Sequence, residues 1–188
     1  MKYCSECGQP VALTVPKGDH LPRFVCGTCG TIHYQNPRIV AGVVAEWQGR
    51  ILLCKRAIEP RLGYWTIPAG FMENGETIMA AAAREAQEEA LAQVDVGSLL
   101  AIVHVTHANQ VHVMFRGTLV DGTCGVGAES LESKLVEEHE IPWRDVAFPS
   151  VDYALRRYLA DRAAGREDLH ITEIDRRRTA PAPDQRTE

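Results

Sequence analysis

The sequence predicts an α/β domain preceded by a small cysteine-rich module, and three observations support this fold class. Four of the six cysteines form two Cys-x2-Cys pairs, Cys4 with Cys7 and Cys26 with Cys29. Short apolar segments then alternate with two stretches of helical periodicity, which is typical of α/β domains. The chain has 188 residues, enough for one medium-sized domain and an appended module.

Composition and charge exclude several classes of protein. Hydrophobic residues make up 45% and charged residues 24% of the chain, which is ordinary for a globular protein. The net charge of −5 gives no general attraction to nucleic acid or anionic membranes. No apolar run approaches the roughly 20 residues that span a bilayer, and the N-terminus MKYCSECGQP lacks the apolar region of a signal peptide. We therefore expect a cytoplasmic protein with no membrane or nucleic-acid partner.

Residues 1–36 form the predicted cysteine-rich module, which is too small to bury a core of its own. The two cysteine pairs, separated by 18 residues, fit a tetrahedral Zn²⁺ site. Gly8 and Gly30 directly follow the two pairs, where a knuckle turn favours a positive φ. A redox disulfide is the alternative, but two matched pairs favour structural zinc. Four protein ligands leave no open position for a substrate. The predicted ligands are Cys4, Cys7, Cys26 and Cys29.

Five apolar segments after Pro37 predict β-strands, at 39–45, 51–55, 99–105, 111–120 and 131–136. The first two flank a turn at 47–50 and should form a hairpin. Two helices are expected, at 77–92 and 151–164. These elements define a domain over 37–165. Residues 166–188 are polar and contain three consecutive arginines at 176–178, which predicts a flexible, solvated tail.

The first predicted helix carries a cluster of carboxylates at Glu85, Glu88 and Glu89. Their i, i+3 and i+4 spacing places them on one helix face, where like charges destabilise a helix by roughly 0.2–0.5 kcal/mol per pair. A hard divalent cation such as Mg²⁺ would offset this repulsion and commonly binds beside substrate phosphates. Upstream, Gly70 and Gly75 lie in a loop whose backbone can approach a phosphate or metal.

The pattern Gly70-x5-Glu76-x7-Arg84-Glu85-Ala86-x-Glu88-Glu89 resembles the Nudix box of hydrolases that cleave nucleoside diphosphates linked to another moiety. The resemblance implies an α/β/α sandwich with a mixed sheet. It also implies that Glu85, Glu88 and Glu89 bind Mg²⁺ or Mn²⁺, with the Ala69 carbonyl as a further ligand, and that Arg84 and Glu76 form a supporting ion pair. The chain departs from the family pattern at Leu91, where a glycine normally helps to end the helix. A solvated acidic helix is the alternative, but it leaves Gly70 and Glu76 unexplained.

A general base is expected outside this motif, because the bound ions alone do not accept the proton of the attacking water. Nudix proteins often draw another glutamate from elsewhere in the chain, and Glu129 and Glu132 are the candidates here. We favour Glu132, which begins a predicted strand. A surface position without catalytic function is the alternative for both.

Several residues near the motif are candidates for substrate contact. The rings of Tyr64, Trp65 and Phe71 could stack on a nucleobase, and core packing is the alternative for each. Arg56 closes a predicted strand and suits bidentate contact with a phosphate. Gly70 would let the loop backbone approach the substrate closely.

A zinc ribbon ahead of a Nudix domain resembles two groups of enzymes. The NADH pyrophosphatases, some of which remove NAD caps from RNA, carry an SQPWPFPxS stretch that the corresponding region 104–115 (HVTHANQVHVMF) lacks. The other group hydrolyses ADP-ribose or FAD, and we expect that activity, with release of AMP. The first group and a non-catalytic zinc-ribbon nucleotide sensor remain alternatives. The intact glutamates speak against the sensor. The ribbon also offers a surface for a homodimer.

Overall fold

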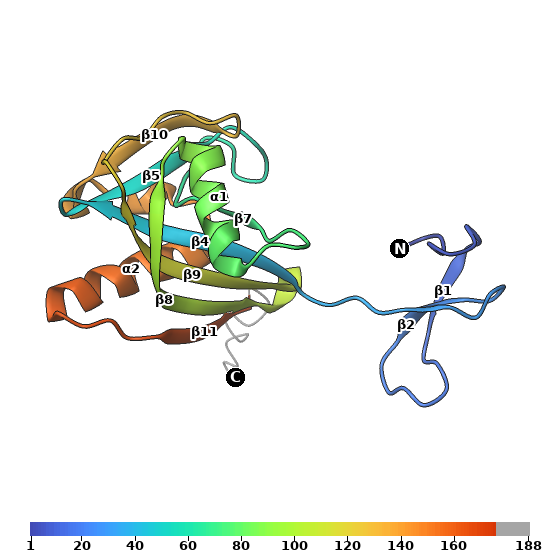
Figure 1. Ribbon diagram of the computed structural model, residues 1–188. Coiled ribbons are helices and arrows are strands. Elements are labelled where there is room, and N and C mark those ends of the chain that lie inside the picture. Colours follow the sequence, from blue (N-terminus) through green and yellow to red (C-terminus); the bar gives the residue numbers. More distant parts are fainter. Residues whose placement is uncertain (176–188) are drawn as a thin grey trace, which may run out of the picture. The chain divides into compact units, whose positions relative to one another are not determined.

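The computed structural model describes residues 1–175 and divides the chain into two compact units, Met1–Pro37 and the part that begins at Arg38 (Figure 1). The division falls one residue from the boundary expected at Asn36-Pro37. The arginines at 176–178 and the rest of the predicted tail beyond Asp175 lie outside the described residues.

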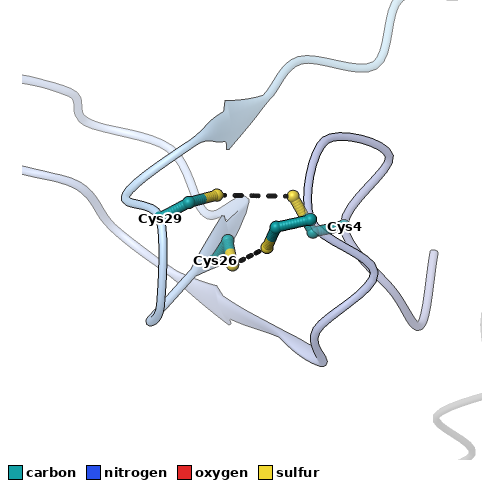
Figure 2. A group of neighbouring side chains, drawn as sticks. Cys4, Cys26 and Cys29 are labelled. Atoms are coloured by element: carbon teal, nitrogen blue, oxygen red, sulfur yellow. Dashed lines mark hydrogen bonds between the residues drawn. The ribbon is translucent and has the colours of Figure 1, made fainter.

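The N-terminal unit is a small antiparallel sheet with almost no apolar core. Its strands, β1 (Val11–Thr14), β2 (Arg23–Cys26) and β3 (Ile32–His33), are ordered β1-β2-β3. Cys4 and Cys26 are its only buried residues, and both belong to the cysteine group drawn in Figure 2. The unit therefore depends on the cysteines for its stability.

The second unit is built on a mixed sheet, as expected, which has eight strands rather than the five predicted. Six strands follow the order β10-β5-β4-β9-β8-β11, and two short strands pair beside them, β6 with β5 and β7 with β4. The pairs β4–β9 and β8–β11 are parallel, whereas the other pairs are antiparallel. The strands are β4 (Arg38–Trp47), β5 (Arg50–Arg56), β6 (Trp65–Thr66), β7 (Ala69–Phe71), β8 (Val94–Val105), β9 (Gln110–Leu119), β10 (Ser130–Val136) and β11 (His170–Ile174).

Two α-helices cover opposite faces of this sheet, which confirms the predicted sandwich. The helices are α1 (Ile78–Ala90) and α2 (Pro149–Ala164), and three short 3-10 helices occupy Thr106–Ala108, Glu138–Glu140 and Trp143–Asp145. In residues 1–175, no helix is long and apolar enough to cross a membrane.

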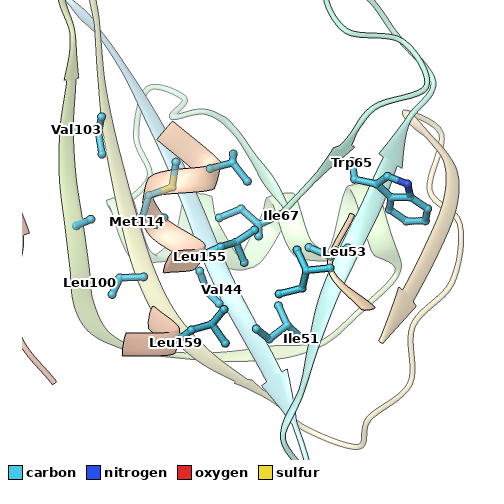
Figure 3. Packing of buried hydrophobic residues seen from close by; sticks show 14 of the residues in the cluster. Val44, Ile51, Leu53, Trp65, Ile67, Leu100, Val103, Met114, Leu155 and Leu159 are labelled. Carbon is cyan, nitrogen blue, oxygen red and sulfur yellow. The ribbon is translucent and has the colours of Figure 1, made fainter. Parts of the chain in front are cut away.

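The alternation of side chains along β4 produces two core layers. Val43 packs with the buried alanines of α1, whereas its neighbour Val44 packs with Leu155 and Leu159 of α2 (Figure 3). Because alanine side chains are small, α1 can approach the sheet closely. This close packing fixes the acidic helix relative to strands β4 and β7.

The prediction of a flexible tail from residue 166 is wrong for β11. This edge strand pairs with β8 in parallel. A buried network holds it: Arg116 donates to the Asp161 carboxylate and, at 2.9 Å, to the Asp168 carbonyl, and His170 Nε2 lies 2.9 Å from Asp161. The short HITEI segment has a weak apolar pattern, so its strand depends on these distant partners.

Candidate active site

Two of the three clustered glutamates of α1 point toward strand β7. Glu85 and Glu89, one helical turn apart, are only 8% and 6% exposed, whereas the Glu88 side chain is 58% exposed. The shared face expected from the sequence is therefore split. Glu85 and Glu89 lie against Gly70 and Ala69 of β7, whereas Glu88 is exposed to solvent.

The Glu85 carboxylate packs directly against the backbone of Gly70. Gly70 pairs with Ala41 of β4, a residue of the α1-side core, and so its Cα faces the helix. A Cβ on Gly70 would overlap the Glu85 carboxylate. The glycine thus brings the backbone of β7 against the acidic helix.

Ala69 holds the other buried carboxylate. Its backbone N–H donates to Glu89 Oε2 at 3.2 Å. The amide thereby fixes the orientation of Glu89, and a ligand role for the Ala69 carbonyl stays a prediction.

Arg84 connects the remaining acidic groups. It donates Nε and Nη2 to the two carboxylate oxygens of Glu76, at 3.1 and 2.9 Å. Its Nη1 donates to Glu85 Oε1 and Glu88 Oε2, both at 2.8 Å, and Nη2 also donates to the Phe71 carbonyl at 3.0 Å. This fork fixes the spacing between two glutamates of α1 and the backbone of β7.

Burial raises the pKa of Glu85 and Glu89, the two inner glutamates, because the nearby positive charge does not fully compensate it. Burial raises the pKa of Glu89 to about 8, and it also raises the pKa of Glu85 against the opposing effect of Arg84. By contrast, the hydrogen bonds from Arg84 lower the pKa of Glu76. The inner carboxylates would be stabilised in their charged form by a cation, and their oxygen atoms suit Mg²⁺ or Mn²⁺.

The inner glutamates are less closely gathered than the cysteines. Within residues 1–175, only the cysteine group brings three or more ligand atoms within 4.8 Å of one another. Arg84 and the Ala69 amide hold the carboxylates at their present spacing.

The structure favours Glu129 over Glu132 as the additional carboxylate. Glu132 lies in β10 opposite Lys55, and its exposed carboxylate is 3.9 Å from Lys134 Nζ. The charge of Glu129, in contrast, contributes to the raised pKa of both Glu85 and Glu89. The loop before β10 contacts the acidic helix through Gly127, whose N–H donates to the Glu89 carbonyl at 3.1 Å. This placement favours Glu129, and the identity of the general base stays a prediction.

Trp65 is part of the core, which favours core packing over stacking on a nucleobase for this ring. It is only 7% exposed, and the ammonium group of Lys134 lies 4.4 Å from its ring centre. Tyr64 is half-buried, with the Arg61 guanidinium 5.2 Å from its ring centre.

Phe71 and Arg56 are better placed for substrate contact. Phe71, which follows Gly70 in β7, is 46% exposed, and the Arg38 guanidinium lies 4.5 Å from its ring centre. The charge of Arg56 acts to lower the pKa of Glu89, and its Nε donates to the Pro60 carbonyl at 2.9 Å. Sequence reasoning missed Arg38 because it comes close to Phe71 only through the pairing of β4 with β7, in which Phe71 lies opposite Val40.

The cysteine group forms a separate, closed site in the N-terminal unit (Figure 2). The Sγ atoms of Cys4 and Cys29 are 3.6 Å apart, and those of Cys7 and Cys26 are 3.5 Å apart. A tetrahedral zinc ion with Zn–S bonds of about 2.3 Å requires sulfur atoms about 3.8 Å apart. The spacing therefore fits zinc. The structure brings together all four cysteines that the sequence predicts as ligands.

Polar groups outside the cysteine pairs also contact the sulfur atoms. Thr31 Oγ1 lies 3.1 Å from Cys29 Sγ, and His33 Nε2 lies 3.3 Å from Cys4 Sγ. The Thr31 hydroxyl and backbone amide lower the pKa of Cys29 to about 6. Such hydrogen bonds favour the thiolate, which is the form that binds zinc.

Known proteins support both parts of this description. The profile described as Nudix N-terminal, a zinc ribbon, matches residues 2–35, and the profile described as NUDIX domain matches residues 35–157. A crystal structure of a Nudix hydrolase from Nitrosomonas europaea is 49% identical, with a TM-score of 0.90 over 93% of this chain and 99% of that chain.

Two groups of curated relatives carry more specific names. The NAD-capped RNA hydrolase NudC of Vibrio vulnificus is 36% identical over 47% of this chain, but the match spans only 32% of that protein. The ADP-ribose pyrophosphatase of Methanocaldococcus jannaschii is 27% identical over 58% of this chain and 67% of that protein. Because the Nudix profile covers well over half of the sequence, this chain belongs to the Nudix family of pyrophosphohydrolases and carries that family's N-terminal zinc ribbon.

Proposed function

We propose that this chain hydrolyses the pyrophosphate bond of a nucleoside diphosphate derivative, with Mg²⁺ or Mn²⁺ as cofactor and ADP-ribose or FAD as substrate. AMP would be one product. The observation that carries the proposal is the pair of buried carboxylates, Glu85 and Glu89, packed against the backbone of Ala69 and Gly70.

The residues of the site would have two roles, metal binding and positioning of the metal ligands. Glu85, Glu88 and Glu89 would hold the divalent ions, which neutralise phosphate charge and lower the pKa of bound water. Arg84 would keep the carboxylates in register through its contacts to Glu76, Glu85 and Glu88.

Glu129 would accept the proton of the attacking water. The water oxygen forms a bond to one phosphorus, and the bond from that phosphorus to the bridging oxygen breaks. The bridging oxygen leaves with the other phosphate group, so two phosphomonoesters result. Glu129 suits this role because its charge acts on both inner carboxylates, although it lies outside α1.

Two observations favour ADP-ribose or FAD as the substrate. The relative named as an ADP-ribose pyrophosphatase aligns over two thirds of its length, and residues 104–115 lack the SQPWPFPxS stretch of the NADH group. The exposed Phe71 ring with Arg38 offers an apolar face and positive charge to a nucleotide.

NADH or NAD-capped RNA is the second candidate substrate, favoured by the relatives named NAD-capped RNA hydrolase NudC. A panel of ADP-ribose, FAD, NADH and NAD-capped RNA separates the candidates when AMP or the decapped RNA is measured with and without Mg²⁺. We expect Mg²⁺-dependent turnover that is fastest with ADP-ribose or FAD. Preference for NADH or capped RNA would overturn the substrate choice. Binding of a panel member without any turnover would support the non-catalytic sensor instead.

A further inference from the structure

Leu91 ends the metal-binding helix in a conformation that leucine rarely adopts. Its backbone is left-handed, with φ 49° and ψ 30°, and its N–H donates to the Gln87 carbonyl at 3.0 Å. A glycine would adopt this conformation without steric strain. The helix therefore ends where the Nudix pattern has glycine, but here a side chain is present at that position.

That side chain lies on the loop formed by residues 121–129, which packs against the C-terminal end of α1. Gly125 N–H donates to the Ala90 carbonyl at 2.6 Å, and Gly127 N–H donates to the Glu89 carbonyl at 3.1 Å. A Cβ on Gly125 would lie 3.1 Å from Leu91 Cδ1, and a Cβ on Gly127 would overlap the Glu88 carbonyl oxygen. Both glycines are thus sites of close approach between the loop and the helix.

The same loop leads directly to Glu129. Ser130 N–H donates to the Gly127 carbonyl at 3.1 Å, and Ala57 N–H donates to the Glu129 carbonyl at 2.8 Å. The backbone of Glu129 is therefore fixed on one side by the glycine that contacts α1 and on the other by the end of β5. A loop displaced from α1 would carry Glu129 with it.

We propose that Leu91 is a positioning residue that covers Gly125, holds residues 121–129 on the end of α1, and thereby keeps Glu129 beside the metal-binding glutamates. The catalytic consequence rests on the proposed function, whereas the structural part does not. The left-handed backbone conformation of Leu91 is unfavourable for a leucine. The contact between its side chain and Gly125 offsets this cost.

Leu91→Gly separates the backbone strain at residue 91 from the contact that the leucine side chain makes with the loop. Because glycine relieves the left-handed strain, we expect the melting temperature to stay unchanged or to rise by about 2–4 °C. Loss of the side chain should loosen the loop, so that amide exchange at Gly125 and Gly127 accelerates. Displacement of Glu129 should lower kcat for ADP-ribose by about 10-fold, with KM changed less, because small misplacements of a reacting group are costly.

Two further variants complete the test. Leu91→Met keeps a long apolar side chain and should retain wild-type exchange and kcat. Leu169→Ala removes a leucine that is similarly exposed, 50% against 53% for Leu91, and should change neither measurement. Wild-type exchange at Gly125 and Gly127 in Leu91→Gly would overturn the proposal, and so would faster exchange with unchanged kcat.

Failure of the proposed function would give a different result. If the wild-type chain hydrolyses no member of the substrate panel, the proposed activity falls. The exchange of Gly125 and Gly127 in the Leu91 variants then still decides whether Leu91 holds the loop, because amide exchange needs no substrate.

Discussion

The two regions suited to metal ions are built in opposite ways. In the N-terminal unit the four cysteine sulfurs lie within 4.8 Å of one another, and Cys4 and Cys26 are the only buried residues of the unit. In the second unit the glutamates belong to a helix, α1, that packs on an extensive core cluster, and they are held by Arg84 and a backbone amide. The cysteine region thus has ligands without a core, whereas the glutamate region has a core that supports its ligands.

This difference assigns different physical roles to the two metals. Zinc would supply folding free energy that the small unit cannot obtain from apolar burial. The divalent ion at the glutamates would compensate charge in a domain that is already folded. Removal of a ligand should therefore unfold the first region and inactivate the second.

Cys26→Ser should have the largest effect, because structural zinc contributes about 10–16 kcal/mol in comparable small domains. We expect loss of bound zinc and of amide protection over residues 1–37, while residues 38–175 keep their protection. Metal analysis together with hydrogen exchange measures both effects. Cys124→Ser is the control, because Cys124 lies in the second unit and should leave the zinc content unchanged. A full equivalent of zinc in folded Cys26→Ser would contradict the assignment.

Glu89→Gln should reduce kcat by more than about 100-fold, because even the partners of metal ligands are typically worth 10–100-fold. The melting temperature should stay the same or rise, since glutamine removes a buried carboxylate whose pKa burial raises to about 8. Turnover of ADP-ribose and thermal unfolding measure the two properties.

Gln87→Ala changes an exposed residue of the same helix and serves as the control for Glu89→Gln. Retained turnover in Glu89→Gln would place the divalent ion elsewhere. A large loss of stability in Glu89→Gln would show that the glutamate region, like the cysteine region, needs its metal ligands in order to fold.

Local patterns in the sequence predicted most of the fold. The cysteine pairs, the two helices and the strands β4, β5, β8, β9 and β10 were accessible because each depends on spacing within a short segment. The short strands β6 and β7 were not predicted, because they form by pairing with β5 and β4. Strand β11 was not, because its polar sequence is stabilised by Arg116 and Asp161, which lie far away in the chain.

The same limit applies to the candidate site. Helical spacing predicted the acidic helix, and the resemblance to the Nudix box implied the ion pair between Arg84 and Glu76. Spacing could not show that Trp65 is buried or that the loop leading to Glu129 contacts the acidic helix. Both facts arise from long-range packing, although the three glycines between residues 121 and 128 are a sequence signal of close contacts in that loop.

His33→Ala should have the smallest of these effects, and it tests whether the cysteine region is as local as its ligand pairs suggest. His33 Nε2 lies 3.3 Å from Cys4 Sγ, and a donated hydrogen bond would stabilise that thiolate. We expect zinc affinity to fall by about 10–100-fold, measured by competition with a chromophoric chelator. His33→Gln retains a side-chain donor and should lose less. His20→Ala changes a histidine whose side chain is 88% exposed and should bind zinc normally. Unchanged affinity in His33→Ala would show that the two cysteine pairs alone determine zinc binding, and the contrast with the glutamate region would then be sharper than the structure indicates.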